Sequence, residues 1–423
     1  MERAGLSEAL RAFRSRDGFP LQPAHAGPVL IKEADPGRFM AAFAQAVAGE
    51  ADVFLCDPKW GDSESAQLVA LLQNSRDARP ASRTSRGWLM IPTGGTSGRL
   101  RFARHDSATI AAAVRGFSRH FDLPQVNAAG VLPLHHVSGL MAWLRTVLTD
   151  GVYLPLDWKE IEGGNLPDLP MRPAGWTISL VPTQLERLLR LPATATWLTK
   201  FRILFLGGGP AWPELLDQAA ALKLPLSLGY GMTETAAMAV ALQPAEFLAG
   251  LRSSGTVLPH AQLSVDTDGV IVLGGESLFR GYYPDWREAG AFVTSDVGRL
   301  DNAGHLVVRG RSDAVIISGG EKINPAEVEA GLRGTAGFSE VVVMGLPDAE
   351  WGQVVVAAYP ETLAPDWPAL GPALERLLAP AKRPKYFIPL AQWPVNSQGK
   401  VNRAEIARLA AAGLKAGTFH PKK

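Results

Sequence analysis

The sequence predicts an α/β fold with a large N-terminal part and a small C-terminal unit. Three observations indicate this fold. Up to Pro244, apolar runs typical of buried strands alternate with turns and with stretches of helical periodicity, which favours parallel α/β layering. After Pro244 the strands alternate apolar and polar residues and are joined by hairpin signals. Residues 310–313 then indicate a domain boundary, after which strands and helices resume.

The composition limits the classes of protein to consider. With 423 residues, of which 47% are hydrophobic and 20% charged, the chain is typical of a globular protein of two or three domains. Its formal net charge of +1 indicates neither a nucleic-acid partner nor an anionic membrane surface, so any polyanion must be bound locally. Residues 1–20 contain no signal-peptide core, and no later segment has about eighteen consecutive uncharged apolar residues. We therefore predict a cytoplasmic location.

The N-terminal elements lead to a glycine-rich loop. They are two helices within residues 1–50, a strand around Cys56, a helix inside 61–86 and a strand at 89–91. Cys56 is the only cysteine, which excludes internal disulfide bonds and a thiolate metal cluster. Because it lies in an apolar run, we interpret it as a core residue rather than a reactive thiol.

The loop after the strand at 89–91 has the composition of a phosphate-binding loop. It contains Thr93, Gly94, Gly95, Thr96, Ser97 and Gly98, followed by Arg99 and Arg101. Glycines let backbone N–H groups approach phosphate oxygens, hydroxyls add donors and arginines add positive charge. The spacing is not the Walker pattern, and an ordinary surface turn is an equally good interpretation of the loop alone.

Two adjacent histidines follow the next helix and strand, which we predict at 107–121 and 128–134. Zinc binding by His135 and His136 is not expected, since neighbouring strand positions point to opposite faces and no Cys or acidic partner lies at ligand spacing. His135 is equally well explained as a capping or core residue. His136 is the better functional candidate, because ligands bind at the carboxyl ends of strands in open α/β sheets.

Two further strands, at 201–206 and 224–228, end in glycine-containing segments. The glycines at 207–209 suit either a flat ligand against bare backbone or a tight turn. Residues 229–235 combine an aromatic ring, glycines, hydroxyls and a carboxylate, which could supply a ring face, a phosphate donor and a Mg²⁺ ligand.

The remaining elements are predicted as hairpins and a C-terminal unit. The hairpin strands lie at 261–265 with 269–275, and at 292–300 with 305–311. The C-terminal unit has strands at 314–318, 341–345 and 353–358, a helix beginning at Asn324 and a helix at 370–378. A lysine on a glycine loop, such as Lys400, is more often a solvated tip than a catalytic group.

The order of five motifs resembles the acyl-adenylate-forming superfamily, which includes acyl-CoA synthetases, adenylation domains and luciferases. The motifs are the loop 93–101, the Tyr-Gly-x-Thr-Glu segment 230–234, Ser295-Asp296, the hinge block 310–329, and the Asn-x-x-Gly-Lys-x-x-Arg segment 396–403. Within the superfamily, segments 135–140, 180–185 and 318–321 are most similar to o-succinylbenzoate-CoA ligases of menaquinone and phylloquinone biosynthesis.

Two departures from the family pattern are visible. Arg101 stands where the loop usually has a lysine, which keeps the charge but changes its geometry. Fewer residues than usual precede the loop, so the N-terminal subdomain is expected to be smaller than is usual in the family.

The resemblance implies a domain organisation and a reaction. Residues 1–311 would form layered α/β subdomains with a small β-barrel-like part, and residues 312–423 a small, mobile α+β domain. A carboxylic acid would be activated by ATP and Mg²⁺ as an acyl-adenylate and transferred to CoA, most simply 2-succinylbenzoate to 2-succinylbenzoyl-CoA. No nucleic acid or integral membrane segment is implied, and a homo-oligomer is compatible with the resemblance.

The resemblance also assigns roles to individual residues. Catalysis would depend on Lys400, Thr233 and Glu234, with Glu234 as the Mg²⁺ ligand. ATP would be bound by Thr93, Gly94, Gly95, Thr96, Ser97, Gly98, Arg101, Gly208, Gly209, Tyr230, Gly231, Asp296 and Arg311. The acyl pocket would include His136, Ser138, Gly139 and Thr183, the CoA channel Gly319 and Gly320, and the hinge Asp313.

The sequence is compatible with three alternatives. The chain could act on another aryl or fatty acid, it could load a carrier protein instead of CoA, or it could be a non-catalytic nucleotide-binding relative. The presence of Glu234 and Lys400 argues against the third alternative. The residue that would bind a second substrate carboxylate is not identified by the sequence.

Overall fold

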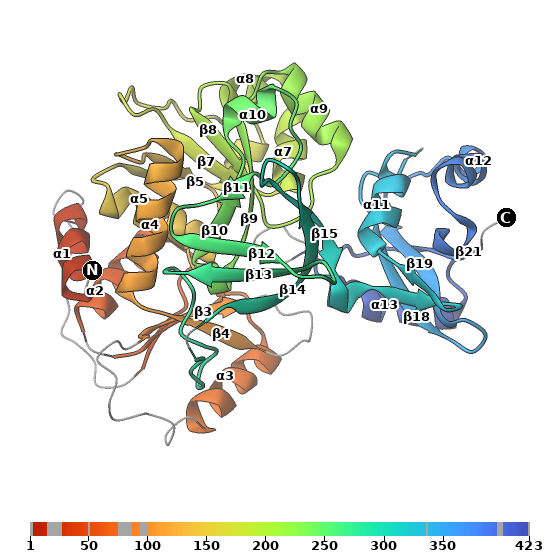
Figure 1. The fold of residues 1–423 in the computed structure, drawn as a ribbon, viewed down its shortest axis with the longest axis horizontal. Helices are drawn as coiled ribbons and strands as arrows, with labels where there is room; N and C mark the ends of the chain where they lie inside the picture. The colour runs from red at the N-terminus through yellow and green to blue at the C-terminus, as the bar shows by residue number, and fades with distance from the viewer. Residues whose placement is uncertain are drawn as a thin grey trace.

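A computed structural model describes residues 3–14, 28–49, 51–74, 87–93, 100–288, 290–335, 337–395 and 401–421. Figure 1 shows a large body that contains the elements up to β15 (Leu306–Arg311) and a smaller body that begins after it. Within these described ranges, three sheets belong to the large body and one to the smaller body.

The first sheet carries the strand that precedes the glycine-rich loop. Its strands are β1 (Val29–Ile31), β2 (Val53–Leu55), β3 (Leu89–Thr93) and β4 (Arg101–His105), in that order. The first three are parallel, and β4 runs antiparallel to β3. The accompanying helices are α1 (Arg3–Arg14), α2 (Pro36–Ala48) and α3 (Asp62–Asn74). Phe43 of α2 packs edge-on against Trp143 at a ring-centroid distance of 5.4 Å, which joins this sheet to the next layer.

The second sheet brings the carboxyl ends of five parallel strands to one edge. Its spatial order is β11-β10-β9-β8-β7-β5-β6, and β5 to β9 are mutually parallel. The strands are β5 (Ala128–Gly130), β6 (Tyr153–Pro155), β7 (Thr177–Leu180), β8 (Ile203–Leu206), β9 (Leu226–Met232), β10 (Ala237–Ala241) and β11 (Thr256–Val257). The helices are α4 (Ser107–Phe121), α5 (Val137–Leu148), α6 (Trp158–Glu162), α7 (Pro182–Leu189), α8 (Pro192–Leu198), α9 (Pro213–Ala221) and α10 (Pro244–Leu248). The predicted parallel α/β layering is confirmed.

The third sheet consists of the two predicted hairpins. Strands β12 (Ala261–Val265), β13 (Val270–Gly275), β14 (Phe292–Leu300) and β15 pair antiparallel in sequence order. Buried side chains of β13 and β15 pack against Ala239 and Val240 of β10, so this sheet lies against the antiparallel edge of the second sheet.

The smaller body has a sheet with a hydrophobic cluster formed around α11 and α12 and another around α13. Its elements are β16 (Ile316–Ser318), β17 (Glu321–Ile323), α11 (Pro325–Arg333), β18 (Val342–Asp348), β19 (Gly352–Pro360), α12 (Trp367–Leu377), β20 (Tyr386–Leu390), α13 (Arg403–Ala416) and β21 (His420–Pro421). The predicted helix start is confirmed, since the Asn324 side chain accepts a hydrogen bond from the Ala326 N–H and Pro325 occupies the first turn.

Several strand boundaries differ from those predicted. β5 ends at Gly130 instead of Leu134, and β9 continues through Met232, where we expected a loop. β4 was not predicted, because Arg101 and Arg104 interrupt the apolar pattern that indicates a buried strand. One of them, Arg104, is buried, and its two terminal nitrogens donate hydrogen bonds to the Gly87 and Pro284 carbonyls inside the fold.

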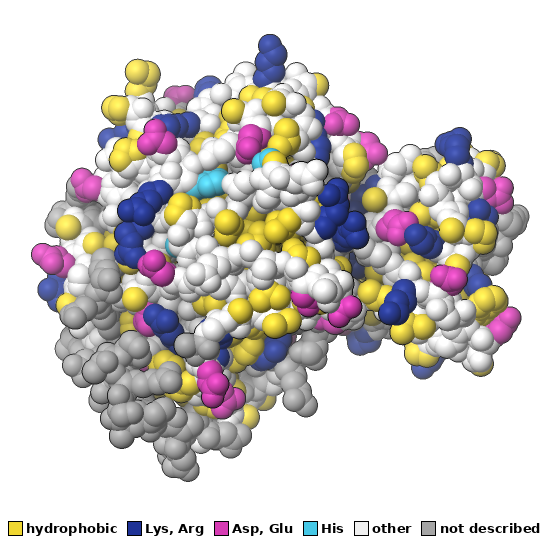
Figure 2. Space-filling view, viewed as in Figure 1, with side chains coloured by type: hydrophobic (Ala, Val, Ile, Leu, Met, Phe, Trp, Pro, Cys, Tyr) yellow, Lys and Arg dark blue, Asp and Glu magenta, His cyan; other side chains and the backbone are white. Residues whose placement is uncertain are grey.

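Cys56 is buried, and burial raises the pKa of its thiol to about 12, as expected for a core residue. Figure 2 shows charged side chains of both signs scattered over the visible face, in keeping with the near-zero net charge. Within the described residues, no helix is long and apolar enough to cross a bilayer.

Candidate active site

A short turn at the end of β9 holds Glu234, the predicted Mg²⁺ ligand. Residues Thr233–Thr235 form a single 3₁₀ turn, and Glu234 is buried. The Tyr282 hydroxyl donates a 2.6 Å hydrogen bond to Glu234 Oε1. Burial and the adjacent Glu234 carboxylate raise the pKa of Tyr282, so its hydroxyl remains protonated and acts as a donor. The guanidinium carbon of Arg101 lies 4.7 Å from the centroid of the Tyr282 ring.

A buried histidine fixes the position of the same turn. His105 Nε2 lies 2.8 Å from the Thr233 carbonyl oxygen, and Nδ1 lies 3.0 Å from Thr109 Oγ1. A carbonyl oxygen only accepts, so Nε2 carries the proton. Burial lowers the pKa of His105 to about 4, and Nδ1 of the neutral ring is left as an acceptor for the Thr109 hydroxyl. The hydrogen bond from Nε2 joins β4 to the Thr233 backbone, and the contact with Thr109 joins β4 to α4.

The predicted adenosine-binding residues form a second polar cluster. The Tyr230 hydroxyl donates to Asp296 Oδ2 at 2.7 Å, and Arg311 lies 3.3 Å from Asp296 Oδ1. Arg311 also makes a two-point ion pair with Asp313, at 2.8 and 2.6 Å. The hydrogen bonds from Arg311 to Asp313 raise the pKa of the guanidinium. β9, β14 and the segment that leaves the large body therefore meet at Asp296.

The backbone around the β9 turn is tightly constrained. A Cβ on Gly231 would lie 2.0 Å from the Ala237 carbonyl oxygen, so only glycine fits there. Ala236 and Ala237 have φ values of 53° and 78°, a region that alanine rarely adopts. Such strain is more frequent at functional sites than elsewhere. At Gly209, by contrast, a Cβ would meet no atom within 4 Å, so open space lies beside it.

The predicted acyl residues lie at the first turns of two helices. His136 precedes α5, Ser138 and Gly139 lie in its first turn, and Thr183 lies in the first turn of α7. Both helices start at the strand edge that also carries the glycines after β8 and the turn after β9. Gly139 has a packing explanation, because a Cβ there would lie 2.2 Å from the Pro133 carbonyl oxygen.

Some predicted residues lie outside the described residues. These are Gly94, Gly95, Thr96, Ser97 and Gly98 of the glycine-rich loop, and Lys400. The residues that flank the loop are described: Thr93 and Arg101 pair across β3 and β4, and Thr93 Oγ1 lies 3.5 Å from the Arg101 carbonyl oxygen.

The predicted CoA-channel glycines form the turn between β16 and β17. Gly319 and Gly320 both have positive φ values, 57° and 83°. The Trp351 ring lies against Gly319, whereas the space beside Gly320 is open. The positive φ values of this turn therefore account for both glycines, and the open space beside Gly320 leaves its backbone accessible.

One prediction about the histidines is wrong. The absence of an acidic partner for His135 was inferred from sequence spacing, but Asp57 lies next to it in space, with Oδ2 3.5 Å from His135 Nε2. The opposite-face argument also fails, because β5 ends before the histidines and their ring centroids lie only 4.4 Å apart. Tyr282 and His105 were missed as well. Only the aromatic pair after Gly281 could have drawn attention to Tyr282.

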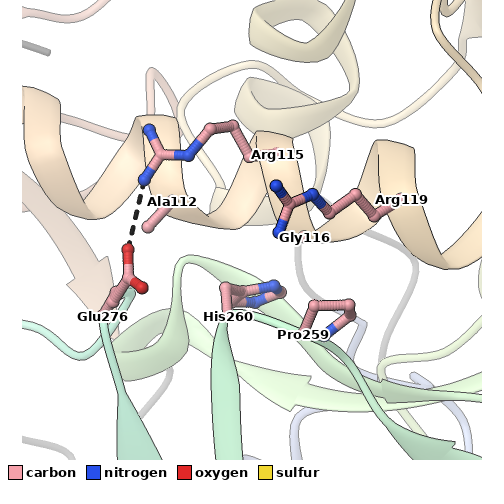
Figure 3. A pocket seen from close by; sticks show the side chains of 7 residues that line it. All are labelled: Ala112, Arg115, Gly116, Arg119, Pro259, His260 and Glu276. Atoms are coloured by element: carbon pink, nitrogen blue, oxygen red, sulfur yellow. Dashed lines mark hydrogen bonds and ion pairs between the residues drawn. The ribbon is translucent and has the colours of Figure 1, made fainter.

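Two cavities lie apart from these polar clusters. A small one, of about 40 Å³, lies between α4 and the start of β12 and is lined by Arg115, Arg119 and His260 (Figure 3). It includes none of the predicted site residues, and Arg115 is paired with Glu276 at 3.1 Å. A larger pocket, of about 560 Å³, lies at the carboxyl ends of β1, β2, β5 and β6 and includes His135.

The amino-acid sequence is similar to those of several acid–CoA ligases. A 2-succinylbenzoate–CoA ligase of Listeria monocytogenes is 35% identical over 288 residues, which cover 65% of this chain and 60% of the relative. An indoleacetate–CoA ligase of Aromatoleum aromaticum is 30% identical over 365 residues, which cover 81% of this chain and 71% of the relative. The match to the Listeria ligase thus spans about 60% of that protein's length.

A solved structure has the same fold. The o-succinylbenzoate CoA synthetase of Bacillus subtilis, in complex with the acyl-adenylate intermediate OSB-AMP, superposes with a TM-score of 0.75 at 22% identity, covering 96% of this chain and 92% of that one. The expected architecture, a large N-terminal part followed by a smaller C-terminal part, is therefore confirmed. The model of the AMP-binding enzyme family matches residues 40–283, more than half of the chain. The chain belongs to the AMP-binding enzyme family.

Proposed function

We propose that this protein is an ATP-dependent acid–thiol ligase that converts 2-succinylbenzoate to 2-succinylbenzoyl-CoA through an acyl-adenylate. The observation that carries the proposal is the convergence of two polar clusters on the β9 turn. Tyr282 and Glu234 lie at one end of this turn, and Tyr230 and Asp296 lie at the other. One cluster offers a carboxylate for a metal-bound polyphosphate, and the other offers a carboxylate and a hydroxyl that suit a ribose. A ligase of this name at 35% identity supports the choice of substrate.

The first step forms the acyl-adenylate. A carboxylate oxygen attacks the α-phosphorus of ATP, the bond between the α-phosphorus and the bridging oxygen breaks, and pyrophosphate leaves. The protein would act by positioning the reactants and neutralising charge on phosphate oxygens. Thr233 would contact the α-phosphate, while Arg101 and the loop after Thr93 would bind the β- and γ-phosphates. Tyr230 would border the adenine.

Mg²⁺ fits the chemistry of the Glu234 side chain. Carboxylate oxygens are preferred ligands of Mg²⁺, which is bound through one or two carboxylates and substrate phosphates. Tyr282 donates to Oε1 of Glu234, and this hydrogen bond orients the carboxylate. The ion would neutralise phosphate charge there.

The second step transfers the acyl group. The sulfur of CoA attacks the acyl carbon, the bond from that carbon to the AMP oxygen breaks, and AMP leaves. We propose that residues 312–423 move as a domain about Asp313 between the two steps, so that Lys400 serves adenylation and Gly319 and Gly320 then face the CoA channel. The two-point ion pair of Asp313 with Arg311 would hold one of these positions. A cytoplasmic location is part of this proposal.

Acid-dependent exchange of labelled pyrophosphate into ATP tests the function. We expect exchange with 2-succinylbenzoate and Mg²⁺, and a lower kcat/KM with indoleacetate, benzoate and medium-chain fatty acids. Preference for another acid would favour the first alternative, which the indoleacetate–CoA ligase similarity supports. Absence of exchange with every acid would contradict catalysis by this chain.

A further inference from the structure

Three side chains with metal-binding atoms lie together at the carboxyl ends of two sheets. Asp57 follows β2 of the first sheet, and His135 and His136 follow β5 of the second. One ligand atom from each of these residues lies within 4.8 Å of the ligand atoms of the other two. Asp57 and His135 are buried, with exposed fractions of 8% and 5%. A buried carboxylate beside two imidazoles is a donor set that divalent transition metals favour.

The local backbone explains how adjacent histidines reach one centre. After β5 the chain forms a turn in which the His136 N–H bonds to the Pro133 carbonyl at 3.2 Å. His136 then occupies the N-cap position of α5 without using its side chain as a cap. The two imidazole rings are inclined by 48°. Both can therefore lie on the same side of the turn, which two successive strand residues could not do.

The distance between the Asp57 carboxylate and the His135 imidazole suits binding of both groups to one metal ion. Two ligands that are each 2.0–2.1 Å from a tetrahedral zinc ion lie about 3.3 Å apart. The observed distance between Asp57 Oδ2 and His135 Nε2 is 3.5 Å. The other carboxylate oxygen of Asp57 accepts a hydrogen bond from the Lys59 N–H at 2.9 Å, which orients Oδ2 toward His135. One ring nitrogen of His136 lies within 4.8 Å of the ligand atoms of Asp57 and His135, and this half-buried side chain would have to rotate toward them on metal binding.

The pocket beside this cluster favours a cation. Four carboxylates and one lysine line the pocket of about 560 Å³: Glu33, Asp35, Asp57, Asp157 and Lys59. Asp35 and Asp157 cap α2 and α6, so they contribute negative charge but are already engaged by backbone N–H groups. Asp57 and His135 line the same pocket. A metal held by three protein ligands keeps an open coordination position, and here this position would be reached from the pocket.

We propose that Asp57, His135 and His136 bind one divalent transition-metal ion of the zinc class, with an open coordination position toward this pocket. The site does not include the proposed Mg²⁺ ligand Glu234 and shares only His136 with the predicted acyl pocket, and its metal binding can be measured without the proposed ligase activity. The competing interpretation is a plain ion pair between Asp57 and His135 that joins the two sheets.

The experiment titrates the untagged, chelator-treated full chain with Co²⁺ and then with Zn²⁺. We expect one equivalent of Co²⁺ to produce visible d–d absorption, and Zn²⁺ to abolish it by displacement. His135→Gln and Asp57→Asn should each weaken Co²⁺ affinity about 100-fold or more, since even outer-shell changes cost 10- to 100-fold. Glu234→Gln should bind Co²⁺ as the parent chain does, which excludes the nucleotide site as the source.

A third variant keeps the test decisive if a buried substitution prevents folding. His136→Gln changes a half-buried side chain outside the hydrophobic core, and it should also weaken Co²⁺ binding. Lack of stoichiometric Co²⁺ or Zn²⁺ binding would overturn the proposal. Binding that is unchanged in His136→Gln and in whichever buried variant folds would overturn it as well, and would leave the ion-pair interpretation.

Discussion

The Tyr282 hydroxyl and the Glu234 carboxylate form a 2.6 Å hydrogen bond that joins the segment after β13 to the turn after β9. Arg101, the first residue of β4, lies over the Tyr282 ring, so one aromatic side chain contacts both Arg101 and the proposed Mg²⁺ ligand. We therefore predict that Tyr282 acts through Glu234 as a positioning residue.

Removal of the Tyr282 hydroxyl tests this relationship. A hydrogen bond to a charged group contributes about 1.5–3 kcal/mol, so Tyr282→Phe should lower kcat/KM for Mg-ATP by about 10- to 100-fold. The Mg²⁺ concentration needed for half-maximal pyrophosphate exchange should also rise, an effect that simple loss of packing would not produce. The control is Tyr386→Phe, since the Tyr386 ring packs against Phe419 in the smaller body. Unaltered Mg²⁺ dependence in Tyr282→Phe would refute the positioning role.

Substitution of two glycines by alanine should affect different properties, namely thermal stability at Gly231 and ATP affinity at Gly209. Gly231→Ala places a Cβ 2.0 Å from the Ala237 carbonyl oxygen, so it must distort the pairing of β9 and β10 and lower the thermal midpoint of unfolding. Gly209→Ala meets no atom within 4 Å, so stability should be unchanged. If adenine lies against Gly209, the KM of the Gly209→Ala variant for ATP should nevertheless rise. Differential scanning fluorimetry with ATP titration separates the two effects, and an unchanged ATP affinity in Gly209→Ala would remove this residue from the site.

The buried His105 should make stability depend on pH. Burial lowers its pKa to about 4, below the ordinary value of 6.5, so the unfolded chain binds more protons between these values. The stability that neutral His105 contributes is complete above pH 6.5 and is lost as the pH falls toward 4. This loss amounts to roughly 3 kcal/mol. Urea unfolding from pH 7 to pH 4 should show a shallower loss in His105→Gln than in the parent chain, and parallel curves would contradict the assignment.

Lys400 should separate the two half-reactions. Lys400→Ala is expected to slow adenylation by roughly 10²- to 10³-fold, the usual cost of losing one electrostatic donor. Thioester formation from supplied acyl-adenylate should remain largely intact. Lys415→Ala, in the last turn of α13, is the control. Equal loss of both half-reactions in Lys400→Ala would contradict the domain alternation.

Local signals in the sequence predicted local structure well. The alternating strands at 261–265 and 269–275 predicted the β12–β13 hairpin, and the capping residue Asn324 predicted the start of α11. In each case the residues that determine the conformation are neighbours in the chain, so turn and capping preferences were sufficient.

Contacts between distant segments were not predictable in the same way. Asp57 and His135 meet because β2 and β5 end close together although they belong to different sheets, and Tyr282 meets Glu234 although 48 positions separate them in the chain. No periodicity or spacing in one sequence encodes such pairs. They depend on how the sheets pack, which only the folded chain reveals.

The most direct test of the central claim is the product formed from 2-succinylbenzoate, ATP, Mg²⁺ and free CoA. We expect equimolar AMP and 2-succinylbenzoyl-CoA, measured by liquid chromatography with mass detection, and no thioester when ATP is omitted. Formation of acyl-adenylate without any CoA thioester would contradict the claim and favour a carrier-protein acceptor.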